Sequence, residues 1–88
     1  MTFGDAIAEM QFDKKVRRDG WDRDQFIFLV PGSTFKVNRP PLSTIYPLGT
    51  EIEYLPHIDL RRNDDETIEV WTAPHVDLVA IDWRIVPG

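Results

Sequence analysis

The chain has 88 residues and no cysteine, which limits it to one domain with a small core, spanning residues 1–88, and excludes disulfides and cysteine-based zinc sites. Its formal net charge is −5, and it lacks the long lysine and arginine clusters that bind DNA or RNA, so we expect no nucleic-acid partner. No apolar run reaches the roughly 18–20 residues of a membrane span, and Asp5 and Glu9 interrupt any signal-peptide pattern, so we expect a soluble, cytoplasmic protein without a membrane partner.

The first predicted element is a helix at residues 3–11. Thr2 and Asp5 fit an N-terminal capping pattern, with a hydroxyl at the cap and a carboxylate in the first turn. Four apolar residues recur at helical spacing and form one stripe: Phe3, Ala6, Ile7 and Met10. This apolar stripe has to be buried, and we expect it to pack on a β-sheet.

A basic run and two strands are predicted next. KKVRR at 14–18 is interpreted as a solvated strand or helix end. QFIFLV at 25–30 is short, apolar and aromatic, which is typical of a strand buried on both faces. TFKV at 34–37 alternates, and we predict that it pairs back on 25–30 as a hairpin across Pro31 and Gly32.

The second half of the chain is predicted to be mainly β. Segment 38–50 holds three prolines and a glycine, which exclude a central strand or a helix, and irregular segments of this length usually bind or cover something. Strands are predicted at 51–55, 57–62, 67–71 and 83–86. A turn at 63–66 joins two of them as a hairpin, and 76–82 is predicted as a short helix. The fold class is therefore α+β, an N-terminal helix packed on a mainly antiparallel sheet.

Both histidines lie in near-identical stretches, PHID at 56–59 and PHVD at 74–77. Residues i and i+2 of a strand share a face, so His57 and Asp59 are expected side by side. His75 and Asp77 enter a helix, where such residues diverge. A metal site and an acid/base pair are the alternatives, and each needs further groups that the sequence does not place nearby. We therefore predict no metal site, no cofactor and no catalytic residue.

Three tryptophans are the stronger signal in a chain of this length. Trp83 is interpreted as a core residue, because large rings dominate small cores. Trp21 and Trp71 lie beside turns among polar residues, where they either pack in the core or stack on a nucleobase. Arg23 or Arg39 is then a candidate for bidentate phosphate binding, with plain solvation as the alternative.

The stretch WTAPHVDLVAIDW at 71–83 resembles the C-terminal signature of a family of small phage and bacterial proteins that includes the Thoeris anti-defence sponge of the second type. Other stretches resemble family motifs in the same order, so the likeness covers nearly the whole chain. They are FGDAIAEM at the opening helix, KKVRRDGW at a Lys-x-x-x-Arg-x-Gly-Trp turn, and VPGSTFKVNRPPL and HIDL in the central part.

This resemblance implies a binding protein and not an enzyme. Characterised members of the family bind cyclic nucleotide immune signals, such as glycocyclic ADP-ribose or a cyclic dinucleotide, and hold them without cleaving them. They form homotetramers with ligand pockets between subunits. By position, Trp21 and Trp71 are the stacking rings and Asp77 is a polar contact. The expected ligand-binding set is Trp21, Arg23, Phe26, Trp71, Thr72, His75 and Asp77.

The chain departs from the family pattern at Pro74 and His75, where Ser-Gln is usual. A serine there caps the following helix, whereas Pro74 has neither a hydroxyl nor an N–H, so the cap is expected to shift to Thr72. His75 replaces an amide and is able to titrate.

The predicted function is sequestration of a cyclic nucleotide-derived signal in the host bacterial cytosol by a homo-oligomer, expected to be a tetramer. The alternative is a protein-binding inhibitor or structural phage protein with no small-molecule ligand, which docks through segment 38–50. A third interpretation, a phosphodiesterase or nucleotide hydrolase, requires the bound nucleotide to be cleaved.

Overall fold

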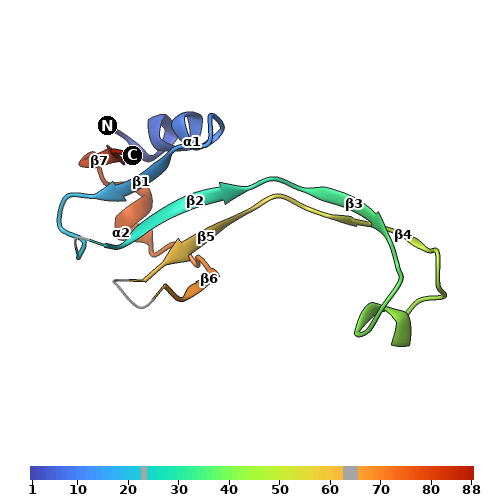
Figure 1. Ribbon diagram of the computed structural model, residues 1–88. Helices are drawn as coiled ribbons and strands as arrows, with labels where there is room; N and C mark the ends of the chain where they lie inside the picture. Colours follow the sequence, from blue (N-terminus) through green and yellow to red (C-terminus); the bar gives the residue numbers. More distant parts are fainter. Residues whose placement is uncertain (23, 63–65) are drawn as a thin grey trace.

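The computed structural model describes residues 1–22, 24–62 and 66–88. Its elements, in chain order, are α1 (Phe3–Met10), β1 (Lys15–Arg18), β2 (Phe26–Val30), β3 (Ser33–Lys36), the 3₁₀ helix η1 (Leu42–Thr44), β4 (Glu51–Tyr54), β5 (His57–Arg61), β6 (Ile68–Val70), α2 (His75–Leu78) and β7 (Trp83–Val86) (Figure 1). The α+β class is confirmed. The predicted turn at 63–66 falls mostly outside the described residues.

One five-stranded sheet, in the order β6-β5-β2-β1-β7, forms the centre of the molecule. Every pairing in it is antiparallel. The hairpin of β5 and β6 and the last strand β7 are confirmed, whereas the solvated position expected for the basic run is wrong. That run forms β1, which lies between β2 and β7, and its Val16 and Arg17 are buried.

The predicted hairpin of 25–30 with 34–37 is also wrong. β2 pairs with β5, and β3 pairs with β4, so the chain runs straight through Pro31 and Gly32. A Cβ at Gly32 would lie 2.7 Å from the carbonyl oxygen of Tyr54, which shows how closely the two backbones approach there. The pairing partners lie beyond segment 38–50, which is too far along the chain for a local turn pattern to reveal them.

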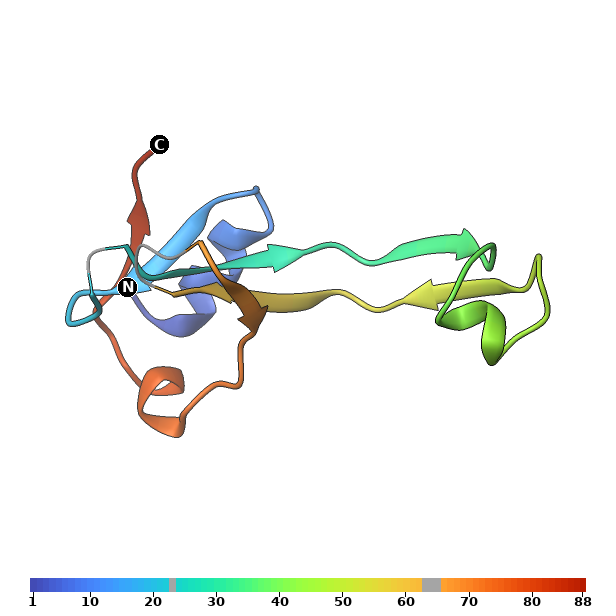
Figure 2. The same ribbon diagram turned by 60° about the horizontal axis from the view of Figure 1, so that its bottom comes forward.

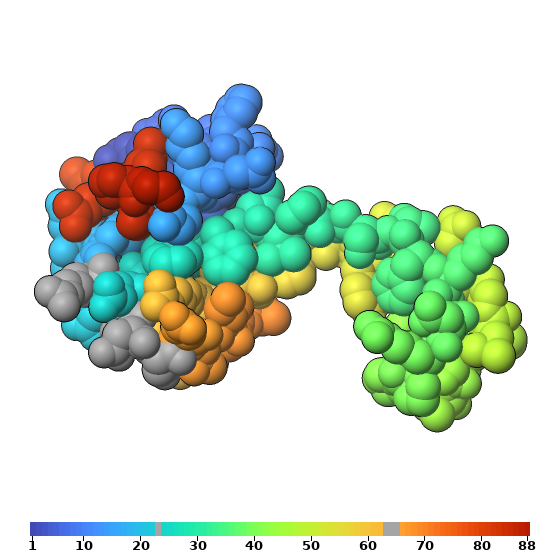
Figure 3. Space-filling view, viewed as in Figure 1, coloured from blue at the N-terminus to red at the C-terminus, as the bar shows by residue number. Residues whose placement is uncertain are grey.

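The molecule consists of a body and an arm. We call residues 31–56 the arm and the other described residues the body. The arm is the continuation of the β2–β5 pair into the β3–β4 ribbon, and it ends in η1 (Figure 2). In the space-filling view the tip of the arm stands apart from the body (Figure 3), and the molecule measures 46 × 27 × 27 Å.

The core lies between α1 and one face of the sheet. Its buried residues are Ala6, Met10, Val16, Ile27, Leu60 and Trp83. Thr2 and Asp5 cap α1 as predicted: the Asp5 N–H donates to Thr2 Oγ1 over 3.2 Å, and the Thr2 N–H donates to Asp5 Oδ2 over 3.1 Å.

Strand β2 is buried on one face only, contrary to the sequence prediction. Ile27 is fully buried, whereas Phe26 and Phe28 on the opposite face are partly exposed. Ile68 and Val70 of β6 lie on the same face and are also exposed, with Arg61 and Asp59 of β5 between the two pairs. The body therefore keeps a sheet face, with four apolar residues among charged ones, that its own core does not use.

Candidate functional site

Four aromatic rings form a cluster at one end of the core. Phe3 and Trp83 lie 5.1 Å apart between ring centroids, and Trp21 contacts Trp83 edge-to-face at 5.2 Å. Trp71 completes the cluster at 6.1 Å from Trp83 and 6.4 Å from Trp21. Trp83 is buried, as predicted, whereas Trp21 and Trp71 are only partly buried. Each of these two indoles packs inward with one side and keeps another side accessible.

Backbone contacts hold both accessible indoles in place. Trp21 follows β1, and its N–H donates to the Arg18 carbonyl over 3.2 Å. The guanidinium of Arg17, itself buried, donates to the Trp21 carbonyl. The Trp71 N–H extends the β5–β6 pairing by donating to the Ile58 carbonyl over 2.9 Å. Two segments far apart in the sequence thus present indoles at one place.

A hollow of about 370 Å³ lies beside these two rings. We call it the indole hollow. Its ring and polar lining residues are Trp21, Gln25, Glu69, Trp71, Thr72 and Asp77. The structure therefore brings together Trp21, Trp71, Thr72 and Asp77 of the predicted set. Sequence reasoning missed Gln25 and Glu69, because both are ordinary surface residues until the β5–β6 hairpin places them next to the rings.

Arg18 of β1 connects Asp77, which lines this hollow, to the sheet. Its Nη1 donates to Asp77 Oδ1 over 2.9 Å, and its Nε donates to Asp82 Oδ1 over 2.8 Å. The Asp77 carbonyl accepts a bond of 2.9 Å from Trp83 Nε1. The hydrogen bonds that Arg18 donates to Asp82 and, second, to Asp77 raise the pKa of Arg18, and the same bond to Asp82 lowers the pKa of that carboxyl. Asp77 is thereby fixed by both its side chain and its backbone.

A comparison with models of protein families identifies the family of this chain. A model of the Thoeris anti-defense 2-like domain matches residues 1–86. The chain belongs to the Thoeris anti-defense 2-like family. A search of curated proteins finds no match. Membership makes this an anti-defence domain, and the resemblance noted in the sequence is confirmed.

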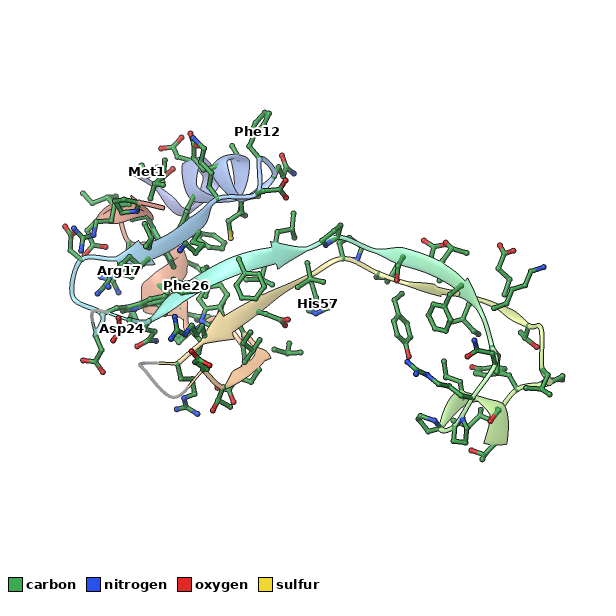
Figure 4. The ribbon with its side chains drawn as sticks, viewed as in Figure 1. Met1, Phe12, Arg17, Asp24, Phe26 and His57 are labelled. Atoms are coloured by element: carbon green, nitrogen blue, oxygen red, sulfur yellow. The ribbon has the colours of Figure 1, made fainter. Side chains whose placement is uncertain are left out.

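Other residues of the expected set lie elsewhere in this Thoeris anti-defense 2-like domain, or outside the described residues. Phe26 lies on the opposite sheet face, where Lys15 Nζ is 5.0 Å from its ring centroid (Figure 4). His75 is exposed at the first position of α2 and does not line the indole hollow. Arg39 lies on the arm. Arg23 falls outside the described residues.

The helix α2 begins at His75, with Pro74 at the N-cap position and no side-chain cap, so the expected shift of the cap to Thr72 is wrong. Pro74 has the extended backbone that is usual for an N-cap residue, with φ −63° and ψ 147°, and the helix is only four residues long. Asp77, which would otherwise reach back to the cap, bonds to Arg18 instead.

The two His-x-Asp stretches differ as predicted. His57 Nε2 lies 3.1 Å from Asp59 Oδ1 on β5, at the end of that strand nearest the arm (Figure 4). Asp77 faces Arg18, and no ion pair between His75 and Asp77 is found in the described part of the chain. Across residues 1–22, 24–62 and 66–88, no three histidine, aspartate or glutamate side chains gather closely enough to hold a metal ion. Within the same ranges, no helix has the length and apolarity that crossing a membrane demands.

Proposed function

We propose that this anti-defence domain binds a cyclic nucleotide-derived immune signal in the indole hollow and holds it without cleaving it. The observation that carries the proposal is the pairing of two partly exposed indoles, Trp21 and Trp71, at the wall of one hollow. Family membership supplies the anti-defence context, and stacking on an aromatic ring is the general means by which proteins hold nucleobases.

The chemistry of the hollow suits the base and sugar of such a ligand. Stacking on an indole contributes about 1–3 kcal/mol per base. Gln25 offers both a donor and an acceptor, and Thr72 offers a hydroxyl. Glu69 and Asp77 accept hydrogen bonds from ribose hydroxyls or an exocyclic amine. Carboxylates repel phosphate, so the phosphates of the ligand would point out of the hollow, toward another subunit.

We further propose that the domain works as a homo-oligomer, expected to be a tetramer. A chain of this size buries little apolar surface alone. Exposed Ile68 and Val70, at 54% and 66%, lie on the same sheet face as Phe26 and Phe28, which the core does not use. Covering such a face with a second copy stabilises both chains and brings additional residues to the ligand.

The test is native mass spectrometry of the purified protein with glycocyclic ADP-ribose and, separately, with a cyclic dinucleotide. We expect a saturable complex of an oligomer with intact ligand, recovered unchanged after denaturation. Trp71→Leu should weaken binding at least tenfold, because about 1.4 kcal/mol corresponds to one decade. Phe12→Leu is the matched control, since Phe12 is 75% exposed and projects from the far end of α1 (Figure 4).

Because Trp71 also packs on Trp83, a second variant separates folding from binding. Gln25→Ala removes a polar group of the hollow while leaving the ring cluster intact, and it should weaken binding in a folded protein. Recovery of a hydrolysed nucleotide would contradict the proposal and favour a nucleotide hydrolase. Equal binding by wild type, Trp71→Leu and Gln25→Ala would also contradict it.

A second candidate function is supported by the tip of the arm. Ile45 and Leu48 are 66% and 73% exposed there, within the proline-rich segment proposed as a protein-docking surface. This alternative, a protein-binding inhibitor or structural phage protein, predicts no nucleotide complex at all. It also predicts that Ile45→Ser and Leu48→Ser abolish the anti-defence effect in cells, whereas Trp71→Leu leaves it unchanged.

A further inference from the structure

Two carboxylates, Glu69 and Asp77, line the indole hollow, although the ligand proposed for it is an anion. An unpaired carboxylate at this place would repel phosphate. Each of the two is paired with an arginine: Arg18 Nη1 lies 2.9 Å from Asp77 Oδ1, and Arg62 Nη1 lies 3.2 Å from Glu69 Oε1. Two arginines that do not themselves line the hollow therefore balance its charge.

The two arginines are held to different degrees. Arg18 bonds to both Asp77 and Asp82, and its side chain is 26% exposed. The side chain of Arg62 is 58% exposed, and its ion pair within the described part of the chain is with Glu69, which is exposed as well. Because exposed pairs of this kind contribute little to stability, Arg62 is the arginine that is able to leave its partner for a ligand.

Strand register places Arg62 at the rim of the hollow. Leu60 of β5 lies opposite Glu69 of β6, and backbone hydrogen bonds continue this pairing to Arg62 and to Trp71. Because side chains two residues apart on a strand share a face, Arg62, Glu69 and Trp71 all lie on the face that carries Leu60. Gln25, one residue before β2, is next to Arg62 in the antiparallel register of β2 and β5. Arg62 thus stands between residues of two strands that line the hollow.

We propose that Arg62 is the anion-binding residue of the indole hollow. In the free protein, Glu69 holds the guanidinium of Arg62 at the rim. When a base stacks on Trp21 or Trp71, this guanidinium turns to the phosphate at the mouth of the hollow and binds it by charge-assisted hydrogen bonds, for which the planar fork of arginine is suited. This inference rests on the proposed function and deepens it, because it names the residue by which the hollow selects a phosphorylated ligand over an uncharged nucleoside.

A simpler role for Arg62 is to neutralise Glu69 without contacting the ligand, and a double-mutant cycle separates the two roles. Arg62→Gln alone weakens binding of an anion in either role. In the Glu69→Gln background, no carboxylate is left at this position for Arg62 to neutralise. A further loss of affinity on adding Arg62→Gln to that background therefore occurs only if the arginine contacts the phosphate.

The experiment is isothermal titration calorimetry of the full-length protein with glycocyclic ADP-ribose and, separately, with cyclic di-GMP. Adenosine and guanosine serve as uncharged probes. We expect wild type to bind at least one of the two nucleotides, and to bind the nucleosides about tenfold more weakly or not at all. Arg62→Gln should weaken nucleotide binding by about tenfold or more, both in the wild-type chain and in the Glu69→Gln background.

Arg84→Gln is the matched control. The side chain of Arg84 is 57% exposed and pairs with Asp19 over 3.3 Å, so this variant removes the same charge from a similar surface pair. It should bind the nucleotide as wild type does. Since both arginines are exposed, the circular dichroism spectra of Arg62→Gln and Arg84→Gln should match that of wild type.

Two results would overturn the inference and leave the proposed function in place. The first is equal nucleotide affinity in wild type and Arg62→Gln, and the second is equal affinity in Glu69→Gln and the double variant. An equal loss in Arg62→Gln and Arg84→Gln would also overturn it, because such a loss reports net charge and not a contact. A wild-type protein that binds neither nucleotide would overturn the proposed function and this inference with it.

Discussion

At the scale of single residues, Arg18 connects parts of the site that lie far apart in the chain. It belongs to β1, yet its guanidinium bonds to Asp77 of α2 and to Asp82 just before β7. An arginine is suited to this position because its planar fork serves two carboxylates at once. The alternation of β1 places Arg18 on the same sheet face as buried Val16, so a period of two, applied to KKVRR, would have shown that it points inward.

We predict that Arg18→Gln lowers the free energy of unfolding at neutral pH, and that the difference from wild type shrinks in acid. The hydrogen bond from Arg18 holds the pKa of Asp82 below its ordinary value of 3.8. A carboxyl whose pKa is lowered by folding stabilises the fold above its unfolded-state pKa and loses this contribution as pH falls through the folded-state value. Urea denaturation at pH values from 7 down to 3 measures the effect.

The control for this prediction is Lys14→Gln, which removes an exposed pair with Glu9 at 3.5 Å. Exposed pairs contribute little to stability, so the free energy of unfolding of this variant should follow that of wild type at every pH. A deficit in Arg18→Gln that stays constant between pH 7 and pH 3 would show that the arginine acts only through packing.

At the scale of elements, the continuous ribbon from β2–β5 into β3–β4 depends on Gly32. A side chain there would meet the Tyr54 carbonyl at 2.7 Å and Pro56 Cδ at 3.1 Å, distances at which the backbone of one strand has to move. The ribbon carries η1 at its tip, so the geometry at this glycine controls where the tip of the arm lies relative to the body.

We predict that Gly32→Ala destabilises the arm by about 1–3 kcal/mol, the usual cost of overpacking a tight site. Hydrogen exchange should accelerate at the amides of β3 and β4 while those of β1 and β7 stay protected. Gly20→Ala is the matched control, because a Cβ at Gly20 has nothing within 4 Å. Equal exchange rates in wild type and Gly32→Ala would contradict the role given to Gly32.

The elements that the sequence predicts well are those with local signals. The capping pair Thr2 and Asp5 and the helical apolar stripe located α1, and strand alternation located β4, β5, β6 and β7. The β2–β5 pairing has no local signal, because the partner strand lies beyond the arm, and Pro31-Gly32 resembles a turn. For the same reason the sequence gives no indication that Gln25 and Glu69 lie beside Trp21 and Trp71.

At the scale of the whole molecule, the fold places a hollow suited to a ligand at one end of a small core. The body packs Trp21 and Trp71 edge-to-face against buried Trp83 and leaves them accessible at an acidic hollow. The proposed function consists in holding a ligand, so that affinity and abundance replace turnover.

The most direct test of the account is a tryptophan-fluorescence titration with the nucleotide signal that the protein binds in native mass spectrometry. We predict saturable quenching in wild type, because a base stacked on Trp21 or Trp71 contacts the emitting ring, and loss of most of that quenching in Trp21→Leu and Trp71→Leu. Emission that stays unchanged at a ligand concentration that saturates binding would contradict the claim that the indole hollow is the binding site.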